Sequence, residues 1–271
     1  MPHAIGTWAM LAALLAAAAV YVRGWRMLSR RMPARFGQGR LAAFLGGLAA
    51  IVIALASPLD SLAGGRLSAH MVQHQLLMMV APPLLWLGAP IVPALLGFPR
   101  RVGRTVTAVI TSRPVRPAAR IIAHPAFGWI AFSLAFWIWH TAPLYQLALR
   151  SHAWHHVEHA CFVGTALLFW RPVIEAWPDR GPWPRWTMIP YLVLADVQNT
   201  ILAAILTFSD SLIYPAYASA GVGSLSALDD QSLAGVIMWL PGSLVFLVAA
   251  VWLAMGLLNG SRTVRAMAPT P

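Results

Sequence analysis

Four of the chain's nine histidines lie within eight residues, in the stretch HAWHHVEH at positions 152–159. If this stretch is helical, the spacing of His152, His155, His156 and His159 places them in one stripe, with Glu158 at its edge. Imidazole is the commonest metal ligand in proteins and also titrates near neutral pH. The stripe directly precedes the apolar run ACFVGTALLFW, so any chemistry it supports takes place at the mouth of an apolar segment.

Two further histidine-bearing segments could share a site with this stripe. His70 and His74 are four residues apart and therefore lie on one face of a helix, and His140 stands in the segment WHTAPLY. An ion such as zinc lies about 2.0–2.1 Å from each imidazole nitrogen, so ligands from neighbouring helices must converge on it. The sequence predicts a metal site whose candidate ligands are His70, His74, His140, His155, His156 and His159.

The elements that must position these residues are membrane spans. The chain has 271 residues, of which 59% are hydrophobic and 10% charged, whereas a soluble domain carries about 25% charged residues. The apolar residues form continuous runs long enough to cross ~30 Å of hydrocarbon as helices, unlike the ~10-residue alternating segments of a β-barrel. We therefore predict an all-α, polytopic transmembrane helix bundle that forms a single integral membrane domain over residues 1–271. Its seven expected spans are residues 4–22, 41–57, 70–95, 124–142, 154–173, 186–208 and 232–258.

The arginines predict how the chain is oriented. All nineteen basic residues are arginines, and only Arg66 and Arg150 fall in loops on one side of the predicted bundle. The positive-inside rule then places the N-terminus outside and the C-terminus in the cytoplasm. The arginines of the loops account for the net charge of +11. Nucleic-acid binding, which needs a basic folded surface, is therefore not expected. The single cysteine, Cys161, excludes an intramolecular disulfide.

This topology gathers eight of the nine histidines at the outer membrane surface. Spans 4 and 5 are joined by a short loop and should pack as antiparallel neighbours, which brings His140 toward the 152–159 stripe. Glu158 could orient an imidazole by accepting its other N–H, and Met71 and Met78 offer thioethers or fill the core. A structural hydrogen-bond network of the same side chains is the alternative to a metal site.

A second group of polar residues lies in and beside the last two spans. Asp196 falls near the bilayer midplane, where an ionised carboxylate costs about 2.5–3.5 kcal/mol on insertion scales, and Asn199 shares its face. A proton path and a packing network both fit these two residues. Just before the seventh span, Asp230 and Gln231 are candidate ligands or docking charges.

At these segments the sequence resembles the CtaG family of polytopic membrane assembly factors, which is tied to caa3-type cytochrome c oxidase. The segments HMVQHQLLMMVAPPLLWLG, WHTAPLYQLAL, HHVEHACFVGTALLFWRPV and DDQSLAGVIMWLPG carry the resemblance, in this order. The resemblance implies a seven-helix protein needed to make active haem–copper oxidase, through its copper centres. The matching positions are His70, His74, His140, Tyr145, His156, Glu158, His159, Asp230, Gln231 and Trp239. Because the histidine is doubled at positions 155 and 156, the resemblance leaves open which of the two corresponds to the family's histidine.

The leading hypothesis is a non-enzymatic assembly factor that holds copper at the outer face and assists its insertion into the oxidase. Imidazole with thioether suits copper. The alternatives are a haem-binding or electron-transfer protein with axial histidines on facing spans, and a metal or proton transporter that uses Asp196. An enzyme is not expected, because no Ser or Cys nucleophile is placed to pair with a base in these motifs. The expected partners are cytochrome c oxidase subunits and the lipid bilayer of the bacterial inner membrane, and the sequence leaves the oligomeric state open.

Overall fold

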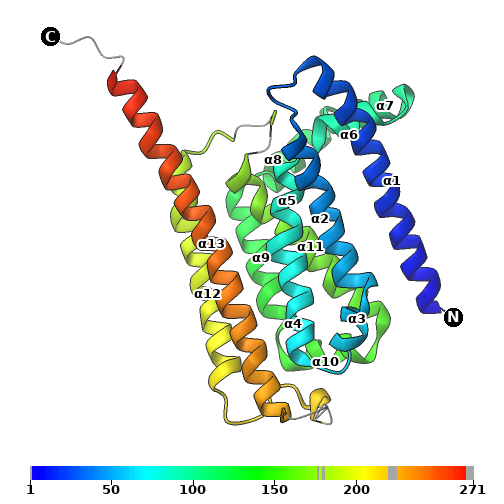
Figure 1. Cartoon of the computed structure of the whole chain (residues 1–271), viewed down its shortest axis with the longest axis vertical. Helices are drawn as coiled ribbons and strands as arrows, with labels where there is room; N and C mark the ends of the chain where they lie inside the picture. The colour runs from blue at the N-terminus through cyan, green and yellow to red at the C-terminus, as the bar shows by residue number, and fades with distance from the viewer. Residues whose placement is uncertain (1, 176, 179–180, 219–224, 267–271) are drawn as a thin grey trace.

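The fold is a bundle of long helices (Figure 1), seen in a computed structural model that describes residues 2–175, 177–178, 181–218 and 225–266. The helices near the site are α1 (Pro2–Arg31), α2 (Gln38–Ala56), α3 (Pro58–Ala63), α4 (Leu67–Gln75), α5 (Ala81–Leu87), α9 (Pro125–Trp139), α10 (Ala142–Arg150), α11 (His152–Ile174), α12 (Met188–Phe208) and α13 (Ala227–Ala266). The others are α6 (Ile91–Gly97), α7 (Arg100–Ile110), α8 (Val115–Ile122), the π-helix η1 (Leu76–Val80) and the 3₁₀ turns η2 (Arg185–Thr187) and η3 (Pro215–Tyr217). Within the described residues every regular element is a helix, which confirms the predicted all-α class.

The seven predicted spans correspond to five straight helices and two bent pairs. Five helices are long and apolar enough to cross a membrane, and the number rises to seven if each bent pair is one span. The predicted span 70–95 bends by 69° between Leu67–Leu87 and Ile91–Gly97. The predicted span 124–142 contains α9, and the bend of 66° between α8 and α9 lies at its start. These segments are therefore apolar enough to span a membrane, but each bent pair consists of two helices that meet at an angle.

A pair of prolines explains the irregular turn inside the third span. Pro82 and Pro83 have no N–H to donate to the carbonyl four residues earlier. For Pro82 that carbonyl belongs to Met78, and it accepts the indole N–H of Trp170 at 2.9 Å instead. The π-helical turn η1 lies directly before these prolines, as expected where the regular ladder of hydrogen bonds is interrupted. It begins two residues after His74, so the regular α-helix that carries the two histidines ends in this irregular turn.

Small residues set the close packing of the long helices. A Cβ atom at Gly235 of α13 would lie 2.7 Å from the carbonyl oxygen of Ala203 on α12, and one at Gly128 of α9 would lie 2.7 Å from that of Leu168 on α11. Such positions let helix backbones approach one another within a membrane. Figure 1 shows the α12–α13 pair along one edge of the bundle and α1 along the opposite edge.

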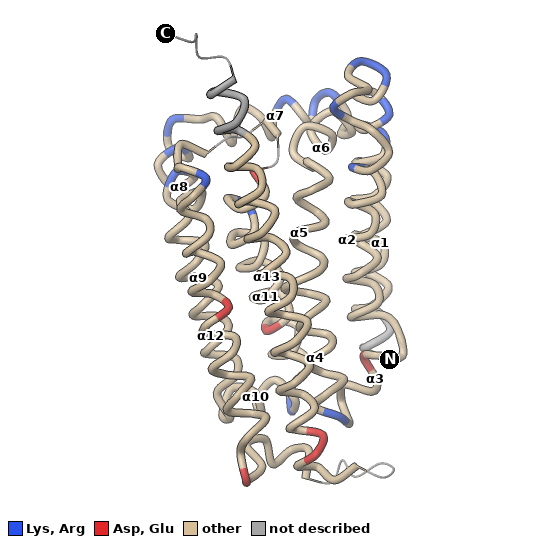
Figure 2. The backbone as a smooth tube through the Cα atoms, turned by 60° about the vertical axis from the view of Figure 1, so that its left-hand side comes forward, with Lys and Arg blue, Asp and Glu red and all other residues tan. Residues whose placement is uncertain are grey.

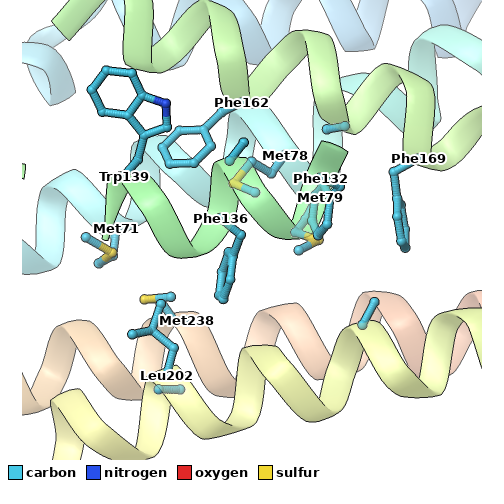
Figure 3. Packing of buried hydrophobic residues seen from close by; sticks show 14 of the residues in the cluster. Met71, Met78, Met79, Phe132, Phe136, Trp139, Phe162, Phe169, Leu202 and Met238 are labelled. Carbon is cyan, nitrogen blue, oxygen red and sulfur yellow. The ribbon is translucent and has the colours of Figure 1, made fainter. Parts of the chain in front are cut away.

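The main core lies between α4, η1, α9 and α11 on one side and the α12–α13 pair on the other. Figure 3 shows aromatic rings and methionines filling this space, with Met71 and Met78 among them and Met238 facing from α13. Both Met71 and Met78 are buried. Of the two roles expected for these methionines, core filling describes their packing, since their neighbours in the cluster are apolar.

Charge divides the bundle into two ends. Figure 2 shows that most arginines gather at the end where α6, α7 and α8 lie, which we call the arginine end. The opposite end, where α3 and α10 lie and α11 begins, carries most of the histidines, and we call it the histidine end. By the positive-inside rule, the arginine end is predicted to face the cytoplasm and the histidine end to face outside.

Candidate metal centre

Three helices bring histidines together at the histidine end. His70 and His74 come from α4, His159 from α11, and His140 from the C-terminal cap of α9. Glu158, beside His159 in sequence, is fully buried among them. The helical spacing and the antiparallel packing of α9 and α11 place these side chains as the sequence suggested.

Four of these residues form a compact donor set, which we call the buried cluster: His70, His74, Glu158 and His159. One ligand atom from each lies within 4.8 Å of the other three. The Nε2 atoms of His70 and His74 are 2.9 Å apart. The Glu158 carboxylate oxygens lie 3.9 Å from the Nε2 atom of His70 and 3.8 Å from that of His74. Ligands around a tetrahedral ion are about 3.3 Å apart, so modest side-chain movement would suffice to bind one.

The unpaired polar atoms of this region are the best indication that the site fits a metal. The Nε2 atoms of His140 and His159 and both carboxylate oxygens of Glu158 are buried without a hydrogen-bond partner among the described residues. A buried polar group left unpaired costs about 1–3 kcal/mol, and native structures contain few of them. A cation with nitrogen and oxygen ligands would satisfy these atoms together, whereas a purely structural network would pair them with one another.

Hydrogen bonds on the far side of the His70 ring prepare its Nε2 atom as a ligand. Burial raises the pKa of the Tyr217 hydroxyl, so this group keeps its proton, which it donates to the carbonyl oxygen of Ala63 at 3.0 Å. The same hydroxyl lies 3.0 Å from the Nδ1 atom of His70 and must therefore accept the N–H of that ring. The Nε2 atom of His70 then carries a lone pair that accepts the N–H of His74 at 2.9 Å, and an ion would take the place of that hydrogen bond.

His140 is prepared in the same way by its own helix. Its Nδ1 atom lies 2.7 Å from the carbonyl oxygen of Phe136 and donates its proton there, which leaves the lone pair on Nε2. The His140 ring centroid is 5.6 Å from that of His74. His140 is thus a neighbour of the buried cluster and a candidate additional ligand.

The doubled histidine of α11 is resolved by the packing of the helix. The His155 ring centroid lies 5.2 Å from that of His70 and 4.2 Å from that of His159. His156, the other residue of the doubled histidine, is exposed. The structure therefore brings His155 to the buried cluster and leaves His156 away from it.

Asp230 and Gln231 position other elements of the site. The Asp230 carboxylate accepts the backbone N–H groups of Leu67 and Ser68 at 2.7 and 3.3 Å, at the start of α4. Gln231 accepts the N–H of Ile213 at 2.7 Å and donates its amide to the carbonyl of Ser211 at 3.1 Å. These bonds hold the helix of His70 and the loop that leads to Tyr217, so both residues act through hydrogen bonds to backbone.

Tyr145 belongs to a layer of buried tyrosines beside the cluster. Its ring centroid lies 5.1 Å from that of His70, and it stacks on Tyr214 at 4.1 Å. Its hydroxyl is 3.3 Å from that of Tyr217, while Tyr214 donates to the carbonyl oxygen of His140 at 2.8 Å. Tyr214 and Tyr217 were missed by sequence reasoning, and only the aromatic segment SLIYPAY before α13 hinted at them.

The polar stripe of α12 pairs with the neighbouring helices α9 and α13. Ser243 of α13 donates to Asp196 at 2.6 Å, and Asn199 donates to the carbonyl oxygen of Met238 at 3.1 Å. Gln198 donates to the hydroxyl of Ser133 on α9 at 3.0 Å. Of the two interpretations that the sequence left open, these contacts favour the packing network.

A helical membrane-type bundle with buried imidazoles and a carboxylate at one end defines a class of polytopic protein with a candidate metal centre. A family model described as "Cytochrome c oxidase caa3 assembly factor" matches residues 19–259. The chain belongs to this Caa3_CtaG family, as the resemblance of its motifs predicted.

Curated relatives are longer proteins. The chain is similar to an uncharacterized protein of Mycobacterium bovis, with 28% identity over 229 residues that cover 81% of this chain and 34% of that protein. An uncharacterized protein of Mycobacterium leprae is 25% identical over 250 residues, covering 85% of this chain and 36% of its own length. The chain thus spans about a third of the length of these relatives. No solved structure matches the chain.

Proposed function

We propose that this protein binds copper at the buried cluster of His70, His74, Glu158 and His159 and assists its insertion into a caa3-type cytochrome c oxidase. The observation that carries the proposal is the set of buried nitrogen and oxygen atoms without hydrogen-bond partners among the described residues. Imidazole ligands suit copper, which also has the highest affinity in the divalent series. Membership of the assembly-factor family supports the oxidase as the recipient.

The chain's own residues would bind, orient and shield the ion. The Nε2 atoms of His70 and His74 would supply lone pairs from one helix once the ion replaced the hydrogen bond between them, and Glu158 would supply negative charge that offsets part of the charge of the ion. The ring of His74 packs against that of Phe162, with centroids 4.6 Å apart, and limits the access of water from the core side. Bound copper would be cargo that the protein gives up to its recipient.

The two alternatives receive less support from the geometry. A haem iron needs a porphyrin plane between axial histidines on facing spans, and the donor atoms of α4 and α11, all within 4.8 Å of one another with Glu158 among them, leave no room for one. A transporter needs a polar path to the arginine end. After His159, the inward residues of α11 are Phe162, Ala166, Phe169, Trp170 and Val173, all buried in the apolar core.

Metal analysis of the purified protein tests the proposal. We expect the parent to bind copper, and His74→Asn and His159→Asn to lose most of it while the protein still accumulates in the membrane. His124→Asn is the matched control, because His124 lies at the arginine end and its cap to the N–H of Ala126 can be made by asparagine. The same variants should lower the activity of the assembled oxidase. Parent protein that binds no copper, or that shows the Soret band of haem, would refute the proposal.

A further inference from the structure

A cavity of about 790 Å³ opens beside the buried cluster at the histidine end. Its walls come from α1, α2 and α11, with apolar side chains such as Met10, Ile51 and Val163. Its polar lining includes Asp60 and four histidines of α11. The cavity reaches His70 and His159, so it joins the surface of the bundle to two residues of the cluster.

The position of α1 accounts for this opening. The first helix packs mainly along α6, and Figure 1 shows it diverging from α2 toward its N-terminus. Gly24 of α1 lies against the backbone of Pro93, and Gly97 of α6 against that of Val20, so the two helices are in close contact near the arginine end. At the histidine end the side chains of α1 leave the space that the cavity occupies.

His155 lies at the boundary between the cavity and the cluster. It lines the cavity and is half-buried, while its ring centroid is 4.2 Å from that of His159 and 5.2 Å from that of His70. Its Nε2 atom is buried without a hydrogen-bond partner among the described residues. The side chain therefore contacts both spaces and has a donor atom to offer.

Other approaches to the cluster are covered by packed side chains. Phe162 lies against His74 on the core side, and Tyr145 lies against His70 on the side of the loops. Asp230 covers the start of α4 with hydrogen bonds to its backbone. Asp60 lines the cavity, and a carboxylate there attracts cations into it.

We propose that this cavity is the route by which a metal ion reaches and leaves the buried cluster, and that His155 is a transfer ligand. The proposal rests on the proposed function, because it concerns the same ion. An ion held by several ligands leaves more readily if an incoming donor replaces one bond at a time. His155 binds the ion as a bond to His70 or His159 breaks, with no change of oxidation state and no permanent bond to His155.

Transfer kinetics with Cu(I) as the probe test this role. The parent and His155→Ala are loaded from a coloured Cu(I) chelator, and the copper is then removed with excess chelator. We expect His155→Ala to bind the same amount of copper with the same equilibrium affinity, while uptake and removal both slow by about tenfold. Ala160→Trp, which adds a large side chain to the cavity lining, should slow both rates as well. Val157→Trp on an exposed face of α11 outside the cavity lining is the matched control.

Each result has one interpretation. If His155→Ala loses copper at equilibrium as His74→Asn does, His155 is a permanent ligand and the proposed role is wrong. If His155→Ala and Ala160→Trp exchange copper at the parental rate, the cavity is not the route, and the proposed function stands without it. Parent protein that takes up no Cu(I) at all would overturn the proposed function itself.

Discussion

The carboxylate of Asp230 accepts the backbone N–H of Leu67 at 2.7 Å, and so caps from α13 the helix that carries His70 and His74. The residue at the N-cap position of α4, Arg66, makes no side-chain cap of its own. The first N–H groups of a helix lack intrahelical partners, and a negative charge is favourable at this end of the helix dipole. The last span thus fixes the short helix of the metal ligands.

Asp230→Asn should therefore weaken both the fold and the site. The substitution removes the charge and one of the two acceptor oxygens that face Leu67 and Ser68, and loss of a cap costs about 0.5–2 kcal/mol. We expect a lower unfolding temperature in detergent and a lower copper affinity, because α4 is no longer held in place. Asp229→Asn is the control, since Asp229 is exposed and, within the described part of the chain, its carboxylate accepts hydrogen bonds from Ser226 at the start of its own helix. Equal behaviour of the two variants would contradict the capping role.

The hydroxyl of Tyr217 should matter for metal affinity through the ring of His70. Tyr217→Phe removes the acceptor of the His70 N–H, and loss of such a partner of a metal-binding histidine lowers affinity by about 10–100-fold. Tyr214→Phe is the control, because the Tyr214 hydroxyl bonds to the backbone oxygen of His140 and to no imidazole. Competition with a chelator of known affinity measures both. If Tyr214→Phe lowers the affinity as much as Tyr217→Phe does, the loop supports the site through its packing, and the hydrogen bond from His70 to Tyr217 has no separate effect on affinity.

The cluster was predictable because its residues follow helical spacing. His70 and His74 are one turn apart, and the 152–159 stripe faces one way, so both faces could be identified from the pattern alone. The choice between His155 and His156 could not be made, since adjacent residues differ by about 100° on a helix and only the position of α4 decides which one faces inward. Tyr217 reaches the site from a connecting loop, where no periodic pattern marks a contact with His70.

The broken course of two spans was also beyond the sequence pattern. Hydropathy measures how apolar a segment is, and each bent pair is apolar enough to span a membrane when its two helices are taken together, so hydropathy does not mark the bend. The irregular turn before Pro82 and Pro83 was not predicted, and the bond that stabilises it comes from Trp170, far along the chain. Hydrogen bonds of this kind depend on tertiary packing and leave no local signal.

Asp196 should tolerate loss of its charge. Asn at this position keeps an oxygen that accepts the Ser243 hydroxyl, so Asp196→Asn should change the free energy of unfolding by less than about 0.5 kcal/mol and leave oxidase assembly intact. Asp196→Leu leaves the Ser243 hydroxyl without its present acceptor and should destabilise the α12–α13 pair. Thermal unfolding and the yield of active oxidase, compared at equal protein level, measure the two effects. An Asp196→Asn protein that accumulates normally but is inactive would restore the proton-path interpretation.

The orientation of the bundle gives the last prediction, because every outer-face argument depends on it. The arginines lie mostly at one end, and the positive-inside rule places that end in the cytoplasm. Single cysteines can test this in a Cys161→Ala background, since Cys161 is the only cysteine of the chain. Asp210→Cys, exposed between α12 and α13 at the histidine end, should react with a membrane-impermeant maleimide in intact cells with a permeable outer envelope. Thr111→Cys, exposed at the end of α7, should react only after the inner membrane is opened. The reverse pattern would place the buried cluster at the cytoplasmic face, where it could not serve a recipient on the outer side.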